Sequence, residues 1–336
     1  MRESLEEIIT LDYGSGGKKT SSLIEEMLVP AFQNEALSAL GDGAILKHQG
    51  DLVFSTDSYV ISPYFFPGGD IGKLSVCGTV NDLSMCGGTP QYLSLGFILE
   101  EGLPVADLRR IVDSIARTAA SCSVQVVTGD TKVVERGRGD GIYINTAGIG
   151  TLTWPGLTPD RIQEGDLVIV SGTVGDHGTA VMLARSGMME AAEIQSDCMP
   201  LNKLAEAALK CGGVRVLRDP TRGGVATTLN EFVENGSLTI ELEEGAVPVA
   251  EGVAGACEIL GLDPLYCANE GKMLVIAEET AADEILNALH RTPGGENAAV
   301  IGHVTKRYPG KVVLRTYLGG TRILAKLTGA QLPRIC

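Results

Sequence analysis

The chain has 336 residues, of which 44% are hydrophobic and 21% charged, and this length allows two domains of roughly 100–200 residues each. Its formal net charge of −15 argues against nucleic acid as a main partner, but it is compatible with cations that bridge acidic side chains and phosphates. No apolar run approaches the roughly 18 residues of a membrane span, so we expect no membrane contact.

The first half of the chain predicts alternating helices and strands. A glycine-rich loop at residues 14–17 leads into an amphipathic helix. Pro104 starts the most regular helix, in which apolar residues recur every three or four positions. Helices are expected over residues 21–32, 70–86 and 104–119, and strands over residues 52–61, 90–99, 124–134 and 141–152.

The second half of the chain follows a break at residues 154–159, Trp-Pro-Gly-Leu-Thr-Pro, which is the candidate linker. Helices are then expected over residues 178–186, 201–210, 223–234, 249–260 and 281–291, and strands over residues 167–171, 214–217, 239–242, 272–277, 300–305 and 312–317. Because strands and helices mix in both halves, we expect an α/β or α+β pair of domains. From residue 318 onward, Gly319, Gly320, Gly329 and Pro333 discourage regular structure.

The last residue, Cys336, places a thiol on a free chain end. Such a thiol suits a group that is loaded in one place and delivered to another, and a frayed end that merely finishes in cysteine is the alternative. Fully extended, residues 318–336 would reach roughly 60 Å. The residues after Glu296 carry seven Lys or Arg and no acid. This cationic end either folds back onto an acidic body or solvates the last strands.

The cysteines and the N-terminus both point to the cytoplasm. None of the eight cysteines forms a CxxC pair or a zinc-type spacing, and several lie in apolar surroundings typical of buried reduced thiols. Residues 1–10 are acidic and lack the apolar core of a signal peptide. We therefore expect a reducing cytoplasmic compartment.

Several aspartates stand beside Gly, Thr or Asn at the ends of predicted elements. A carboxylate flanked by small residues lets a hard cation and phosphate oxygens approach closely, and Mg²⁺ takes one or two protein carboxylates together with substrate oxygens. Each aspartate taken alone is better explained as a helix or turn cap, so the interpretation depends on the set. The set comprises Asp42, Asp57, Asp82, Asp130 and Asp219.

Other catalytic patterns are weak or absent. The segment Gly14-Ser15-Gly16-Gly17-Lys18 lacks the spacing of a phosphate-binding P-loop, and no GxGxxG, HExxH or GxSxG occurs. Glu270 interrupts an apolar strand context, where it is either a base or a partner of Lys272. His177 is interpreted as a residue of a helix cap.

The chain as a whole resembles the HypE family of hydrogenase maturation carbamoyl dehydratases, within the PurM-like (aminoimidazole ribonucleotide synthetase) superfamily. The resemblance covers essentially the whole chain, and the terminal Pro-Arg-Ile-Cys is its most specific motif because it combines sequence with position. Its other motifs are residues 54–60, 66–82, 96–104, 128–134, 175–178, 219–225 and 268–272.

This resemblance implies a PurM-like two-domain fold, α/β plus α+β. Residues 1–36 would form the glycine-rich loop and first helix, and residues 37–154 an ATP-binding domain that builds a β-barrel at a homodimer interface. Residues 155–317 would form the α+β domain, and residues 318–336 a mobile tail that carries Cys336. The expected partners are a second copy of the chain, the carbamoyltransferase HypF and the HypC–HypD iron scaffold.

The implied activity is ATP-dependent dehydration of an S-carboxamide on Cys336 to a thiocyanate, which supplies cyanide ligands for [NiFe]-hydrogenase. Lys132 and Glu270 would polarise and deprotonate the carboxamide. ATP and Mg²⁺ would be held by the five aspartates. Further cofactor-binding positions implied by the resemblance are Asn81, Gly16, Gly17 and Lys18.

Two alternatives remain open on sequence grounds. Another PurM-like enzyme, such as a selenophosphate synthetase or a thiamine-phosphate kinase, would keep the aspartates but would not need the terminal cysteine. The selenophosphate enzyme also uses a Cys/Lys pair in its glycine loop, and no cysteine lies near residues 14–17. A non-catalytic thiol carrier would use Cys336 without any effect of nucleotide.

Overall fold

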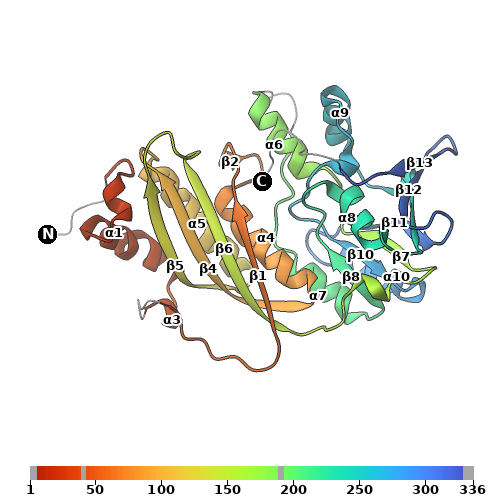
Figure 1. Ribbon diagram of the computed structural model, residues 1–336, viewed down its shortest axis with the longest axis horizontal. Coiled ribbons are helices and arrows are strands. Elements are labelled where there is room, and N and C mark those ends of the chain that lie inside the picture. The colour runs from red at the N-terminus through yellow and green to blue at the C-terminus, as the bar shows by residue number, and fades with distance from the viewer. Residues whose placement is uncertain (1–5, 39–42, 188–192, 328–336) are drawn as a thin grey trace.

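The computed structural model describes residues 6–38, 43–187 and 193–327, and it divides them between two sheets, each covered by helices (Figure 1). None of the helices in this part of the chain is long and apolar enough to cross a membrane. The two-domain α/β architecture expected from the sequence is confirmed, and the two sheets lie side by side along the long axis of the molecule.

The first sheet contains four strands in the order β1-β6-β4-β5. Only β4 and β5 are parallel, and β1 and β5 are its two edges, so the sheet of a single chain is open. The elements of this half are β1 (Leu52–Tyr59), α4 (Ile71–Met85), β4 (Gly88–Glu100), α5 (Val105–Ser121), β5 (Gln125–Val134) and β6 (Ile142–Leu152), with a small hairpin of β2 (Phe65–Phe66) and β3 (Gly69–Asp70).

One face of this sheet is packed and the other is open. In β6, Ile142, Ile144 and Thr146 are buried while Tyr143 and Asn145 between them are more exposed. The alternation follows from the two-residue period of a strand, with α4 and α5 covering the buried face. Each side chain on these strands therefore lies either on the helix-covered face or on the open face of the sheet. Two site residues on opposite faces cannot contact each other within one chain.

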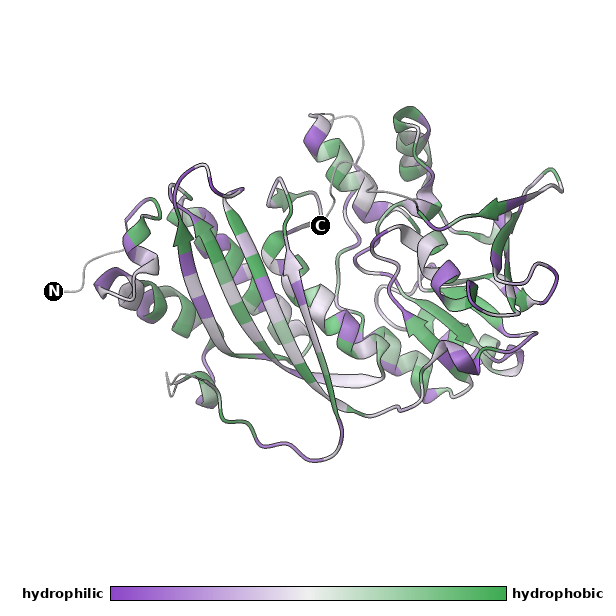
Figure 2. Cartoon of the chain, viewed as in Figure 1, coloured by the Kyte–Doolittle hydropathy of each residue, from purple (hydrophilic) through white to green (hydrophobic). Residues whose placement is uncertain are grey.

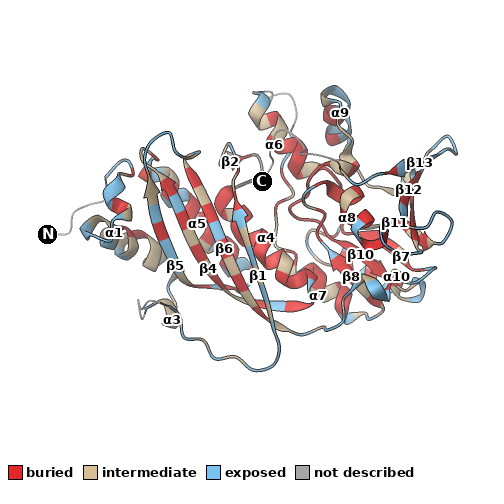
Figure 3. Ribbon diagram, in the orientation of Figure 1, coloured by how far each residue is buried: buried red, intermediate tan, exposed pale blue. Residues whose placement is uncertain are grey.

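The helix α4 is the element that joins the two halves. All of its residues except Lys73 and Asp82 are buried, as Figure 3 shows, because it packs on the first sheet, on α5 and on the second domain. Its N-cap Asp70 accepts hydrogen bonds from the backbone N–H groups of Gly72 and Lys73, which fixes where the helix begins.

Short helical segments precede the first sheet and pack beside β5. They comprise η1 (Leu11–Gly14), α1 (Lys18–Leu23), a π-helical turn η2 (Ile24–Leu28), α2 (Val29–Phe32) and α3 (Glu35–Ser38). A Cβ added to Gly14 would stand 2.5 Å from the backbone nitrogen of Val133 in β5, so the residue at that contact has to be glycine.

The second sheet contains seven strands in the order β13-β12-β9-β11-β7-β10-β8, antiparallel except for the pair β12 and β9. Its strands form one of the most hydrophobic parts of the molecule (Figure 2), and β10 is buried at every position. The strands are β7 (Leu167–Val170), β8 (Val214–Arg218), β9 (Thr239–Glu243), β10 (Leu274–Ala277), β11 (Ala299–Thr305), β12 (Lys311–Arg315) and β13 (Thr321–Leu324).

Helices lie on both faces of this second sheet. Side chains of α7 (Asn202–Lys210) and α10 (Glu279–His290) share one core cluster with it, and α8 (Gly224–Val233) shares another. The helices α6 (Asp176–Ser186) and α9 (Glu251–Leu260) pack together beside it. Short 3-10 turns are η3 (Pro159–Arg161), η5 (Glu244–Ala246) and η6 (Pro264–Tyr266).

Most predicted helices and strands are confirmed with ends shifted by a few residues, but the expectation of irregular structure from residue 318 onward is wrong at one point. Residues Thr321–Leu324 form β13, which pairs antiparallel with β12. The two glycines that discouraged a strand lie in the tight turn between β12 and β13, where Gly319 has a φ of 79°. Residues 328–336 lie outside the described part of the chain.

Candidate functional site

Acidic side chains from both domains converge beside α4. Asp82 is one of the two α4 residues that are not buried, and its carboxylate accepts a hydrogen bond of 2.7 Å from the Ser55 hydroxyl on β1. Asp57, two residues further along β1, shares that face and forms an ion pair of 3.6 Å with Arg222 from the second domain. Burial, followed by the charge of Asp57, raises the pKa of Asp82.

Asp219 completes this group from the end of β8. It is buried, with 9% of its surface exposed. Burial and the nearby charge of Asp82 raise the pKa of Asp219 from 3.8 to about 7. The structure thus brings together three of the predicted aspartates, Asp57, Asp82 and Asp219, and we name them the cleft carboxylates.

Glu270 lies next to the cleft carboxylates, in the loop between η6 and β10. It is 4% exposed, and burial raises its pKa well above 4.5, with further upward contributions from Cys198 and Asp219. Its carboxylate forms no hydrogen bond or ion pair with the described residues, whereas its backbone N–H donates to the Asp197 carboxylate at 3.1 Å. A buried, unneutralised carboxyl group of this kind is a strong candidate for a base.

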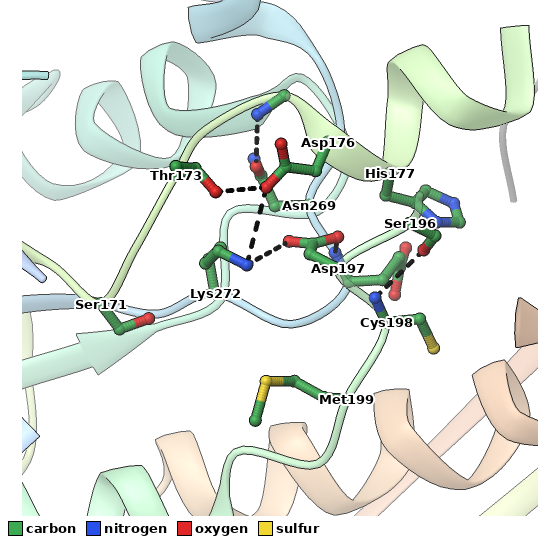
Figure 4. A network of polar contacts seen from close by, with 12 residues as sticks. Ser171, Thr173, Asp176, His177, Ser196, Asp197, Cys198, Met199, Asn269 and Lys272 are labelled. Carbon is green, nitrogen blue, oxygen red and sulfur yellow. Dashed lines mark hydrogen bonds and ion pairs between the residues drawn. The ribbon is translucent and has the colours of Figure 1, made fainter. Parts of the chain in front are cut away.

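The partner of Lys272 differs from the one considered from sequence. Its ammonium group lies 3.3 Å from Asp197 and 3.8 Å from Asp176 (Figure 4), so among the described residues it pairs with these two acids and not with Glu270. Sequence reasoning missed Asp197 because it stands 75 residues from Lys272. His177, expected in a helix cap, is buried in the first turn of α6 and bonds the Ser196 hydroxyl at 2.8 Å.

Asn81 connects the two domains at the same place. Its side-chain amide donates to the carbonyl oxygens of Met199 at 3.2 Å and Glu270 at 3.5 Å, and its oxygen accepts from the Leu201 N–H at 2.7 Å. Both ends of the Asn81 side chain are therefore bound to the backbone of the second domain. This arrangement favours a role in positioning the Glu270 loop on α4.

Replacing Asn81 by alanine is expected to lower the free energy of unfolding by about 2–4 kcal/mol, because the Leu201 N–H and the carbonyl groups of Met199 and Glu270 each lose a hydrogen bond. Thermal unfolding of Asn81→Ala measures this loss, and Asn235→Ala, an exposed site on the turn after α8, is the matched control. If Asn81 instead served only the nucleotide, its replacement would weaken ATP binding and leave the melting temperature unchanged.

Asp130 and Lys132 lie apart from the cleft carboxylates. They stand on β5 and form an ion pair of 2.7 Å, which lowers the pKa of Asp130. Lys132 is in register with Ile98, which is 43% exposed, and so belongs to the open face of the sheet. Asp57 is in register with buried Thr146 and so points to the helix-covered face. Within one chain, these two groups of residues do not meet.

A cavity of about 320 Å³ lies beside Asp130, between β5 and the N-terminal helical segments. Its walls are mainly apolar and include Ile24, Leu28 and Phe97, with Thr20 and Asp130 among its polar residues. Gly16 and Gly17 precede α1 at this end of the molecule, and Lys18 is the first residue of α1. Gly43 also lines the cavity, but its neighbour Asp42 lies outside the described residues, as does Cys336.

Among the residues that the structure describes, no three His, Cys, Asp or Glu side chains form a ready-made metal site. The cleft carboxylates nevertheless suit Mg²⁺, because mutual repulsion and burial raise the pKa values of Asp82 and Asp219 and a cation would relieve both effects. Mg²⁺ commonly binds through one or two carboxylates together with phosphate oxygens, so a preformed cage of protein ligands is not required.

Comparison with known proteins places the whole chain in one superfamily. Residues 40–152 match the N-terminal domain of the AIR synthase related proteins, and residues 163–315 match their C-terminal domain. A thiamine monophosphate kinase from Aquifex aeolicus shares the fold, with a TM-score of 0.61 at 19% identity over 78% of this chain and 87% of that one.

Nearer relatives share one name. The chain is 48% identical to the carbamoyl dehydratase HypE of Azotobacter vinelandii over 98% of this chain and 97% of that protein. It is 46% identical to that of Escherichia coli K12 over 98% and 99%. A crystal structure of the hydrogenase maturation protein HypE in complex with ATP matches with a TM-score of 0.94 and 49% identity, over 97% of this chain and 99% of that one. The chain therefore belongs to the HypE family of carbamoyl dehydratases.

Proposed function

We propose that the protein dehydrates a carboxamide carried on the sulfur of Cys336 to a thiocyanate, using ATP. The observation that supports this most directly is Glu270, a buried carboxyl group beside the cleft carboxylates, with a raised pKa and no ionic partner within residues 6–38, 43–187 and 193–327. A raised pKa makes its carboxylate a better proton acceptor than that of an exposed glutamate, which suits removal of protons from an amide nitrogen.

The chemistry requires the carboxamide oxygen to become a leaving group. The γ-phosphoryl group of ATP is transferred to that oxygen, with loss of the bond to ADP. The nitrogen then gives up both protons as the C≡N bond forms and the C–O bond to phosphate breaks. The products are the thiocyanate, ADP and phosphate. Glu270 accepts one proton from nitrogen and the departing phosphate carries away the other, while the buried surroundings exclude water that would hydrolyse the activated carboxamide.

The cleft carboxylates would hold Mg²⁺ that accompanies ATP, and this cation would spread the negative charge of the triphosphate. Asp57 lies on β1, Asp82 on α4 and Asp219 directly after β8, and this grouping supports the proposed role. Arg222, 3.6 Å from Asp57, adds a positive charge beside the same group. ATP binding by the protein is supported by its likeness to the ATP complex of a HypE protein.

A second copy of the chain would complete the site. Lys132 and Asp130 lie on the open face of the first sheet, where Phe54 is 66% exposed and Ile98 is 43% exposed. Packing two such sheets face to face covers these apolar side chains and closes the barrel expected at a homodimer interface. Closing the barrel would set the edge strand β5 of one chain beside an edge strand of the other, and we propose that Lys132 of one chain reaches the cleft carboxylates and Glu270 of the other across that edge.

The partners proposed for this reaction are proteins that load and unload Cys336. HypF is supported as the loading carbamoyltransferase by likeness to the HypE chain of a HypE–HypF complex, with a TM-score of 0.79 and 46% identity over 90% of this chain and 99% of that one. The HypC–HypD iron scaffold is proposed as the acceptor of the cyano group, and the cytoplasm as the compartment.

Mass spectrometry of the carbamoylated protein tests the proposed reaction. Addition of Mg–ATP is expected to remove one water from the modified C-terminal peptide, and omission of ATP to leave the carboxamide intact. Cys336→Ala should still bind ATP but form no thiocyanate. A mass unaffected by Mg–ATP would support a plain thiol carrier, and continued turnover of free carboxamides by Cys336→Ala would point to a small-molecule enzyme.

A further inference from the structure

The last described residues lie along helix α8 in a fixed order. The Leu324 carbonyl accepts a hydrogen bond of 2.8 Å from the Asn230 side chain, and the Leu327 N–H donates to the Thr227 hydroxyl at 3.4 Å. Residues 324–327 therefore run along α8 from the middle of the helix towards the N-terminal end of that helix. Leu324 itself is fully buried, so this contact is part of the domain core.

Side-chain contacts reinforce this arrangement on both sides. The Tyr266 hydroxyl donates to the Ala325 carbonyl at 2.8 Å, and Lys326 forms ion pairs with Glu234 at 3.1 Å and Glu231 at 3.8 Å. Arg322 pairs with Asp263 at 2.9 Å. Each exposed pair contributes little alone, but six contacts spread over residues 322–327 hold one short segment in a single path. We name residues 324–327 the tail dock.

The tail dock points at the proposed site. Helix α8 begins at Gly224, directly after the loop that starts with Asp219. A Cβ placed on Gly224 would stand 2.6 Å from the carbonyl oxygen of Cys267, three residues before Glu270. Thr227 lies about one helical turn from Gly224, and Glu270 lies three residues beyond Cys267. The path from Thr227 through the Gly224–Cys267 contact to Glu270 is therefore roughly 20 Å long.

The remaining length of chain is sufficient for this distance. Nine residues follow Leu327, and fully extended they span about 30 Å, which is longer than the path by roughly half. That is enough to bring Cys336 to Glu270 even when the tail is not fully extended. Had the whole segment from residue 318 been free, as the sequence predicted, the reach would be twice as long and the terminal thiol would sample a far larger volume.

We propose that the tail dock is a positioning element: it shortens the free tether and aims Cys336 at Glu270 of its own chain. This inference rests on the proposed dehydration of a Cys336 carboxamide and adds the way in which that group is delivered. Fixing the origin of a tether near its target raises the effective concentration of the tethered group, and it makes the reaction depend steeply on the length beyond the fixed point.

A length series tests this dependence by single-turnover conversion of the carboxamide at saturating Mg–ATP. Deleting residues 328–331 leaves five residues, about 17 Å, and is expected to slow thiocyanate formation at least tenfold. Replacing residues 328–331 by Gly-Ser-Gly-Ser should keep the rate within about threefold of the wild type. A third variant combines the deletion with four residues inserted between Leu318 and Gly319, in the exposed turn before the tail dock. Its rate of thiocyanate formation should stay as low as that of the deletion alone.

The test depends on whether the four residues are restored before or after the tail dock. If the insertion in the turn rescues the deletion as well as the Gly-Ser replacement does, residues 319–327 move with the tail and the proposal is wrong. A deletion that leaves the rate unchanged overturns it equally. Failure of the proposed function has a different signature, because the wild-type carboxamide would then lose no water at all.

A point variant checks the ionic part of the tail dock. Lys326→Glu places a third negative charge beside Glu231 and Glu234 and should slow thiocyanate formation by about two- to threefold. Adding Glu234→Lys should restore the rate. Lys306→Glu, which disrupts an exposed ion pair with Glu164, is the control with the same change of charge. Equal effects of the two single variants would show that net charge, and not the dock, is responsible.

Discussion

Mixing two inactive variants, Lys132→Ala and Glu270→Gln, is expected to restore about a quarter of the wild-type dehydration rate. Each variant alone should be slower than the wild type by about 10²- to 10⁴-fold, because each removes a group that we propose acts on the carboxamide. In a mixed dimer, one of the two sites would combine Glu270 of the first chain with Lys132 of the second. Random pairing makes half of the dimers mixed, and each of these has one intact site.

The structural reason for this expectation is the separation of the two residues within one chain. Lys132 belongs to the open face of the first sheet, and Glu270 lies beyond the helix-covered face, next to α4. The measurement is the rate of thiocyanate formation after the two variants are refolded together, compared with each variant treated alone.

The matched control mixes Glu270→Gln with Asp219→Asn. Both residues belong to the same side of the proposed site in the same chain, so a mixed dimer would contain no intact site and should remain inactive. Recovery in this control, or no recovery with Lys132→Ala in demonstrably mixed dimers, would show that the site is not shared between chains in the proposed way.

Asp219→Asn is expected to make the ligand-free protein more stable at pH 8 while abolishing its activity. Burial raises the pKa of Asp219 from 3.8 to about 7. The folded protein thus binds a proton more tightly than the unfolded chain does, and ionisation opposes folding. The penalty is absent below pH 4, grows as the pH rises to about 7, and is complete above that pH, where it reaches about 4 kcal/mol.

Differential scanning calorimetry between pH 5 and pH 8.5 measures this effect. The melting temperature of the wild type should fall as the pH rises, and that of Asp219→Asn should fall less, so that the variant melts about 5 °C higher at pH 8. Mg–ATP should raise the melting temperature of the wild type and leave that of the variant nearly unchanged. Asp160→Asn, at an exposed position, is the control. A less stable variant at pH 8 would show that the Asp219 carboxylate makes net favourable contacts.

Local patterns in the sequence predicted the elements better than the contacts between them. The helix after Pro104 follows from apolar residues spaced three and four apart, because that spacing forms one face of a helix. Strand β13 was missed because three of its four residues are exposed and two glycines precede it, so neither burial nor alternation marks it. Its existence depends on pairing with β12, which is a tertiary contact.

The candidate site was predicted as a set of residue types, and the structure arranges that set in two groups. Asp130 and Lys132 share a face because they are two residues apart on β5, but the face of Asp57 depends on the register of β1 against β6. No local pattern encodes that register. The pairing of Lys272 with Asp197 likewise depends on the packing of distant segments, so the sequence alone left Glu270 and Lys272 as possible partners.

The strand order of the second domain has a consequence for how the protein is made. Strand β11 lies between β7 and β9 in the middle of this sheet, although it is synthesised after both of them. Until residue 305 is available, β7 and β9 present open edges that invite aggregation. A chain that ends early would therefore fail to close its domain, and the thiol proposed to carry the carboxamide, at residue 336, exists only on molecules whose synthesis has passed this point.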